Sequence, residues 1–317
     1  MNPDVFAEWL RLQGHRVVKT ESSYWYNQGP RVFQAFPYHW IIQPSEKELS
    51  SFLVEQKAVG LRFSTNWDAP EGYLSYHAVF EGEMYGLDHL SKWARKNVRR
   101  GLKNCEVLPI SFDLLAKEGL ALQIDTLDRQ GRKLSVTKDA WEQRCLAARD
   151  LPGFEAWGAF VDHLLVASVI VFQMDECAYL LYQQCLRAYL AEHVNNALSF
   201  TVTQNLGARS WIKRILYGLH SLDAPPSVDE FKFRMGYTVK PVRQRVLFHP
   251  KLSPFINPYS YHALRAVVNL LPNRPILAKA EGMMRFYIEG KLPIENQPLH
   301  TLLAGQREEI LQIVSNN

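Results

Sequence analysis

Three apolar segments in close succession constrain the fold of this 317-residue chain more than any other feature. They span residues 154–161, 164–174 and 177–186, and each has the length and composition of a β-strand. Asp162-His163 and Asp175-Glu176 separate them, and such short polar connections are typical of tight turns between antiparallel strands. The sequence therefore predicts a three-stranded antiparallel meander.

Patterned segments on both sides of the meander predict a mixed α/β fold. The second half offers, in order, helices near 113–130 and 138–149, the meander, a helix through Ala197 and Leu206, a strand at 209–219, a short helix at 228–235 and a strand at 242–248. The first half has a similar order: a helix with Asn2 as N-cap, two strands around the turn at 27–30, a helix capped by Ser45, two further strands and a helix at 88–105. We expect one unit at 1–112 and a second at 113–250. Residues 251–317 hold three helix patterns, 261–271, 276–288 and 299–314, and predict a helical tail packed on the second unit.

The helix at 88–105 has an unusual distribution of charge. Its basic residues follow one helix face and no acidic residue interrupts positions 89–105; they are Lys92, Arg95, Lys96, Arg99, Arg100 and Lys103. The opposite side holds Leu90, Ala94, Val98, Gly101, Leu102 and Cys105, which we expect to be buried. One interpretation is a solvated face; the other is a docking surface for phosphate, a nucleotide or RNA. Like charges at i, i+4 repel one another, which favours the docking surface.

Composition limits the class of protein. A hydrophobic content of 47%, a charged content of 21% and a net charge of +4 are typical of soluble globular chains and do not indicate general nucleic-acid binding. Four scattered cysteines fit a reducing compartment better than a disulfide framework. The first residues do not form a secretory signal, and the apolar run at 164–172 is too short to cross a bilayer. We expect a cytoplasmic protein without a membrane span, with the aromatic residues of 24–40 in its core.

Two segments resemble the FemAB-like branch of the Gcn5-related N-acetyltransferase (GNAT) superfamily. Residues 92–107 are similar to the basic helix-to-strand run that ends the first unit of those proteins. Residues 227–242 are similar to their closing signature through Phe231, Lys232, Gly236 and Tyr237, and 193–209 resembles the helix after the meander. The resemblance covers roughly residues 10–250. It implies two tandem GNAT-like units, followed here by the helical tail.

The resemblance leaves two donors open, acyl-CoA and aminoacyl-tRNA. CoA-using members hold pyrophosphate in a Q/R-x-x-G-x-G/A loop between the fourth strand and the following helix, where backbone N–H groups bind phosphate. The near match here, residues 204–209, falls at the end of a predicted helix, so that Gly207 is expected to terminate that helix. The expected partners are thus a phosphate-bearing small molecule or tRNA as donor and an unidentified amine as acceptor. Homodimerisation through the tail also stays open.

The resemblance and the residues together give candidate site positions. By resemblance, the backbone near Tyr182 and Gln184 would stabilise the oxyanion. Tyr217, at the end of its strand, is a candidate to donate a proton to the leaving group. Candidate substrate- or phosphate-binding residues are Arg95, Arg99, Arg100, Lys103, Arg187, Asn195 and Lys232. Three of these side chains also have purely structural interpretations: Tyr217 bonded to backbone, Asn195 as a helix N-cap, and Lys232 extended along the sheet edge. The histidines are isolated, which predicts no metal site.

The sequence predicts an acyltransferase that moves an acyl or aminoacyl group onto an amine. Its alternative is a non-catalytic GNAT-fold module that binds a protein or RNA partner. No nucleophile elbow, phosphate-binding P-loop or dinucleotide fingerprint is present, so hydrolase, kinase and dehydrogenase functions are disfavoured.

Overall fold

The chain divides between two units that interleave along the sequence. The computed structural model describes residues 2–66, 69–82, 84–131, 137–222, 226–271, 274–298 and 303. Unit 1 comprises residues 1–14, 78–218 and 224–238, and unit 2 comprises 15–77, 219–223 and 239–317. The expected boundaries at 112 and 250 follow chain order, whereas these units exchange segments: the basic helix and the strand after it lie in unit 1.

The strands of unit 1 contain the predicted meander. They are β6 (Glu106–Ile110), β7 (Phe154–Val161), β8 (Leu164–Met174), β9 (Cys177–Cys185), β10 (Arg214–Leu219) and the end of β5 (Tyr73–Glu81). Strands β6 to β9 pair antiparallel in chain order, and β10 then pairs parallel with β9. Because β6 pairs with β7, the predicted end of the first unit lies together with the meander in unit 1. The parallel pair needs a crossover, which α6 (Val194–Gly207) supplies.

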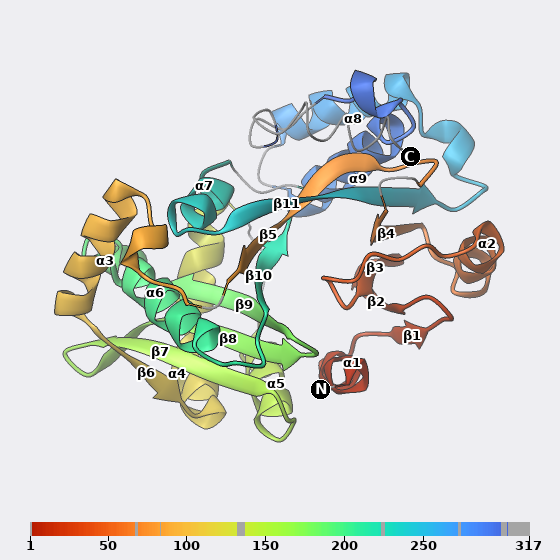
Figure 1. The fold of residues 1–317 in the computed structure, drawn as a ribbon. Coiled ribbons are helices and arrows are strands. Elements are labelled where there is room, and N and C mark those ends of the chain that lie inside the picture. The colour runs from red at the N-terminus through yellow and green to blue at the C-terminus, as the bar shows by residue number, and fades with distance from the viewer. Residues whose placement is uncertain are drawn as a thin grey trace. The chain divides into compact units, whose positions relative to one another are not determined.

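Helices cover both faces of the unit 1 strands. They are α1 (Pro3–Leu12), α3 (Lys92–Asn104), α4 (Phe112–Arg129), α5 (Lys138–Arg149), α6 and α7 (Pro226–Arg234), with the 3-10 turns η1 (Leu87–His89) and η2 (Arg187–Tyr189). Figure 1 shows α3 and α6 on one face of β7–β9 and α4 and α5 on the other. Val98 of α3 and Leu198 of α6 belong to one core with Val169 of β8. Capping fixes several helix starts, because the hydroxyls of Ser91, Ser111 and Thr137 accept bonds from backbone N–H groups.

Unit 2 repeats the order of meander, helix and parallel strand. Its elements are β1 (Val17–Lys19), β2 (Tyr24–Gly29), β3 (Val32–Phe36), α2 (Glu46–Glu55), β4 (Gly60–Thr65), the start of β5 and nearly all of β11 (Thr238–Phe248). Strands β1 to β3 pair antiparallel and β4 pairs parallel with β3. Trp25, Phe33 and Phe63 are buried around Phe52 of α2, which confirms the core interpretation of the aromatic hairpin.

The tail packs in unit 2, which comprises residues 15–77, 219–223 and 239–317, and not on the unit that was expected at 113–250. Because β11 pairs antiparallel with β4, the chain that follows it enters this unit. The tail contains η3 (Ser253–Phe255), α8 (Pro258–Leu270), α9 (Pro275–Glu289) and η4 (Ile294–Asn296). Met283 and Phe286 of α9 bury themselves against Tyr73 and Val246. The third predicted helix, 299–314, lies outside the described residues apart from Leu303.

Candidate functional site

The strands β9 and β10 part inside unit 1 and leave a cleft. Their parallel register runs from Cys177↔Arg214 to Tyr179↔Leu216 and goes no further. A cleft of about 720 Å³ opens beyond this point. Its lining comes from α3, α4, β9, the β9–α6 turn, α6, β10 and α7: Trp93, Thr126, Arg129, Gln130, Leu180, Tyr182, Gln183, Cys185, Leu190, His193, Asn195, Asn196, Tyr217, Val228 and Phe231. All of these residues belong to unit 1.

A β-bulge in β9 borders the cleft. The register with β8 shifts between Ile170↔Leu181 and Ser168↔Gln184, so two β9 residues, Tyr182 and Gln183, lie opposite one. Tyr182 has φ of +47°, a left-handed backbone conformation that is uncommon for a non-glycine residue. The bulge therefore turns backbone groups out of the ladder at the point where β10 has also left.

A short hydrogen-bonded chain crosses the cleft wall. The Tyr217 hydroxyl donates to Gln183 Oε1 at 2.5 Å, and Gln183 Nε2 donates to Asn195 Oδ1 at 2.8 Å. The three residues come from β10, β9 and the first turn of α6. The chain ties together the three elements that meet where the strands part. Asn195 acts inside this chain and does not cap α6, because the N-cap position is taken by His193.

The Tyr217 hydroxyl keeps its proton at neutral pH. Burial raises the pKa of Tyr217 well above its usual value, and the neighbouring Tyr237 raises it further, while the Ser199 hydroxyl lowers it only in part. The Lys232 ammonium lies 5.6 Å from the centre of the Tyr217 ring. Tyr217 is therefore not a base, and in this structure its one hydroxyl hydrogen is directed at Gln183.

The remaining chemistry of the cleft is limited. Burial raises the pKa of Cys185 to about 12, so that its thiol stays protonated and is a poor nucleophile at neutral pH. No Asp or Glu is among the described lining residues.

Across the described part of the chain no three His, Cys, Asp or Glu side chains gather as metal ligands. No described helix has the length and apolar character required to cross a membrane.

Solved structures are similar to this chain in overall fold. No family model matches the chain, and no curated protein sequence matches it. FemX matches with a TM-score of 0.53 at 11% identity, over 78% of this chain and 92% of its own. The C-terminal domain of a proposed lysylphosphatidylglycerol synthetase from Agrobacterium fabrum matches with a TM-score of 0.53 at 11% identity, over 76% and 87%. At such identities the likeness shows the fold alone.

The fold is GNAT-like. The meander, the α6 crossover and the parting of β9 from β10 are the order that the sequence predicted for this fold. The mixed α/β class is confirmed with it.

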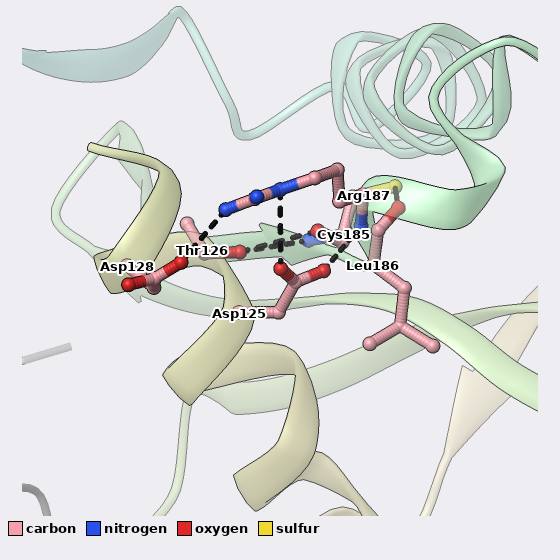
Figure 2. A network of polar contacts seen from close by, with 6 residues as sticks. All are labelled: Asp125, Thr126, Asp128, Cys185, Leu186 and Arg187. Atoms are coloured by element: carbon pink, nitrogen blue, oxygen red, sulfur yellow. Dashed lines mark hydrogen bonds and ion pairs between the residues drawn. The ribbon is translucent and has the colours of Figure 1, made fainter. Parts of the chain in front are cut away.

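The turn from β9 to α6 does not fit the pyrophosphate of CoA. Residues 186–193 contain no glycine. Figure 2 shows Asp125 and Asp128 of α4 directed at Arg187: the Arg187 backbone N–H donates to Asp125, and Arg187 Nη2 lies 2.8 Å from Asp128 Oδ2. A backbone donor of this turn is already used, and two carboxylates oppose a second anion.

Two further predicted residues, Gln184 and Lys232, lie away from the lining. Gln184 is buried, and its side-chain amide donates to Gln123 of α4. Lys232 is buried in an ion pair with Asp229, Nζ to Oδ1 2.7 Å. Tyr182 borders the cleft through the bulge, but its ring packs on Trp9 and on the guanidinium of Arg144 at 4.3 Å.

The predicted basic face on α3 forms a surface hollow of its own. The hollow has a volume of about 470 Å³ and is lined by Lys92, Arg95, Lys96, Arg99, Arg100 and Lys103. No ion pair joins these six side chains to an acidic residue in the described parts of the chain. The opposite side is buried as predicted at Ala94, Val98 and Gly101. Leu102, also predicted to be buried, is 43% exposed.

Several lining residues were not chosen from the sequence. Gln183, His193 and Arg129 line the cleft beside the predicted Tyr217 and Asn195. Gln183 was visible as a polar residue on an apolar strand, but only the bulge decides which face it takes. No local sequence pattern identified His193 as a site residue, because a lone histidine in a loop is most often structural.

Proposed function

We propose that the GNAT-like unit 1 transfers an acyl or aminoacyl group onto an amine, as a FemAB-like protein. The observation that carries this proposal is the open cleft at the parted strands, bordered by the β9 bulge and by the protonated Tyr217 hydroxyl. An amide-forming transfer needs polar donors where negative charge develops on the carbonyl oxygen and on the leaving group. The bulge offers backbone groups that can stabilise the charge on the carbonyl oxygen. Tyr217 offers a hydroxyl for the charge on the leaving group.

Of the two donors considered, aminoacyl-tRNA suits the chain better than acyl-CoA. At the β9–α6 turn two carboxylates lie where the phosphates of CoA would need hydrogen-bond donors. The α3 hollow instead offers six cationic side chains in series, and phosphodiester backbones bind such surfaces with release of counterions. Trp93, on the same helix, lines the cleft, so that a donor lying along α3 would have its acyl end close to Tyr217.

A transfer assay with both donors tests the proposal. Full-length protein is incubated with radiolabelled acetyl-CoA or with tRNA charged with radiolabelled amino acids, and hydroxylamine serves as a small general amine. We expect hydroxamate to form from the charged tRNA faster than in the same mixture without protein, and weaker tRNA binding after Arg99→Glu with Arg100→Glu. If neither donor is consumed or bound, the proposal fails.

The alternative is a GNAT-fold module that binds RNA or protein without chemistry. The closed β9–α6 turn favours it, because a CoA-type phosphate site is missing. The same assay separates the two functions: tRNA binding that depends on Arg99 and Arg100, with hydroxamate formed from either donor only at the rate seen without protein, supports the binding module.

A further inference from the structure

His193 lies at the turn that leads into α6. It is the N-cap residue of α6 with φ of +58°, and the GNAT-like cleft includes it in its lining. Its carbonyl accepts the N–H groups of Asn196 and Ala197, which fixes the backbone. The imidazole forms no hydrogen bond with the described residues, so both ring nitrogens are available to a ligand.

The basic helix holds His193 in place. At Gly101 of α3 an added Cβ would overlap the His193 carbonyl oxygen, which shows how closely the two backbones approach. Asn104 at the end of α3 donates to the Glu192 carboxylate at 2.7 Å and to its carbonyl at 3.3 Å. Two contacts with α3 therefore set the position of the residue pair Glu192-His193.

Burial and the charges of the same helix lower the pKa of the imidazole. The pKa of His193 is lowered, first by burial and then by Arg100 and Lys96 of α3, while Glu192 acts in the opposite direction. From α4, Arg129 shares the cleft lining and adds a further positive charge. From β10, Tyr217 faces the cleft in its neutral form. The imidazole is thus kept neutral at neutral pH, which is the form that accepts a proton.

The other groups of the lining cannot take this role. Cys185 and Tyr217 hold their protons, Arg129 is permanently charged, and no described lining residue is a carboxylate. An amine that attacks a carbonyl must lose one proton to a base. The chemistry of the cleft leaves one described imidazole for that task.

We propose that His193 is the general base that accepts the proton from the attacking amine. This inference rests on the transfer proposed above and adds a catalytic residue to it. The amine lone pair forms the new C–N bond, and the bond from the carbonyl carbon to its carrier breaks, with its electron pair going to the carrier. One proton passes from the nitrogen to His193, and the carrier oxygen takes one from the Tyr217 hydroxyl. Proton exchange with water then restores both side chains.

Histidine NMR of the full-length protein tests the charge state without any substrate. The His193 resonance is assigned by its loss in His193→Gly, a substitution that suits a positive φ. We expect its pKa to lie below that of an exposed histidine and to rise in Lys96→Glu with Arg100→Glu. Lys117→Glu, an exposed charge change on α4, should leave it nearly unchanged. A His193 that is protonated at neutral pH overturns the proposal.

Kinetics with the donor that supports transfer test the catalytic role. We expect His193→Gly to lower kcat by about 10²–10⁴-fold with little change in KM, and to remove the acidic limb of the pH–rate profile. Added imidazole should restore part of the rate, which a purely structural residue would not allow. If transfer proceeds but the variant keeps its rate, or imidazole gives no rescue, His193 is not the base and the transferase function still stands. If wild-type protein transfers nothing, both proposals fail.

Discussion

The Tyr217 hydroxyl and the Gln183 side-chain oxygen lie 2.5 Å apart on two strands whose ladder has already ended. The bond spans the opening between β9 and β10 that backbone pairing leaves. A second hydrogen bond, from Gln183 to Asn195, extends the connection to α6. A hydroxyl that organises three elements and keeps its proton can serve both the shape of the cleft and the chemistry in it.

Tyr217→Phe removes this hydroxyl and leaves the ring in place. We expect a loss of about 1 kcal/mol in the free energy of unfolding, since one hydrogen bond is lost at a half-buried site. We also expect transfer to fall by about 10²-fold or more if the hydroxyl protonates the leaving group. Urea unfolding and the hydroxamate assay measure the two effects.

Tyr259→Phe is the matched control, because Tyr259 is 87% exposed on α8. It should alter neither unfolding nor transfer. Equal activity of Tyr217→Phe and wild type would exclude a proton-donating role for Tyr217.

The bulge explains why the site was only partly predictable from the sequence. A regular strand places Tyr182 and Gln184 on one face and Gln183 on the other. The extra residue at 182–183 breaks that alternation, so the faces taken by Gln183, which lines the cleft, and by Gln184, which is buried against Gln123, do not follow from counting along the strand. The bulge depends on the register with β8, which no local pattern records. Strands, helices and N-caps were predictable because their signals are local.

The same limit applies to the exchange of segments and to Leu102. The pairing of β6 with β7, and that of β11 with β4, joins residues far apart in the sequence, so a boundary drawn in chain order could not anticipate them. On α3 the apolar arc is rotated so that Asn97 is buried in place of Leu102. The close approach of α6 at Gly101 sets that rotation.

Reversing two charges on α3 should weaken the binding of a phosphate-bearing donor. Arg99→Glu with Arg100→Glu removes two cations from the hollow and adds two anions. We expect Kd for tRNA to rise by about 10- to 100-fold at physiological salt, and the slope of log Kd against log salt to become shallower. Fluorescence anisotropy over a salt series measures both.

A control with the same net change of charge is Lys47→Glu with Lys117→Glu, at exposed positions on α2 and α4. It should retain most of the affinity. If the control weakens binding as much as the α3 variant, only overall charge matters and the hollow is not the binding surface.

Gly101→Ala should disturb the packing of α3 on α6. An alanine Cβ would overlap the His193 carbonyl oxygen and approach Ala197 Cβ to 3.0 Å, and a backbone oxygen moves only if the helix moves. Overpacking of this kind costs about 1–3 kcal/mol, of which the higher helix propensity of alanine offsets up to about 1 kcal/mol.

The free energy of unfolding of Gly101→Ala is measured against Gly29→Ala, where nothing lies within 4 Å of the added carbon. We expect the first variant to be clearly less stable than the second. Equal stability would mean that α3 and α6 are not in close contact in solution.

Glu155 of β7 makes the stability of unit 1 depend on pH. Burial alone would raise the pKa of this carboxyl, but it is lowered because Arg209 binds it, with Nη1–Oε1 2.5 Å and Nη2–Oε2 2.9 Å, and Trp157 and Gln173 also donate to it. A carboxyl with a lowered folded pKa stabilises the protein fully above its ordinary pKa of 4.5, and this contribution disappears as the pH falls through the folded value.

Glu155→Gln should therefore lower the free energy of unfolding by about 2 kcal/mol at pH 7, because hydrogen bonds to a charged group are lost. The difference from wild type should shrink when urea unfolding is repeated well below pH 4.5. Glu55→Gln, at an exposed position on α2, should show neither effect, whereas a deficit of Glu155→Gln that is constant with pH would mean that the carboxylate charge does not contribute.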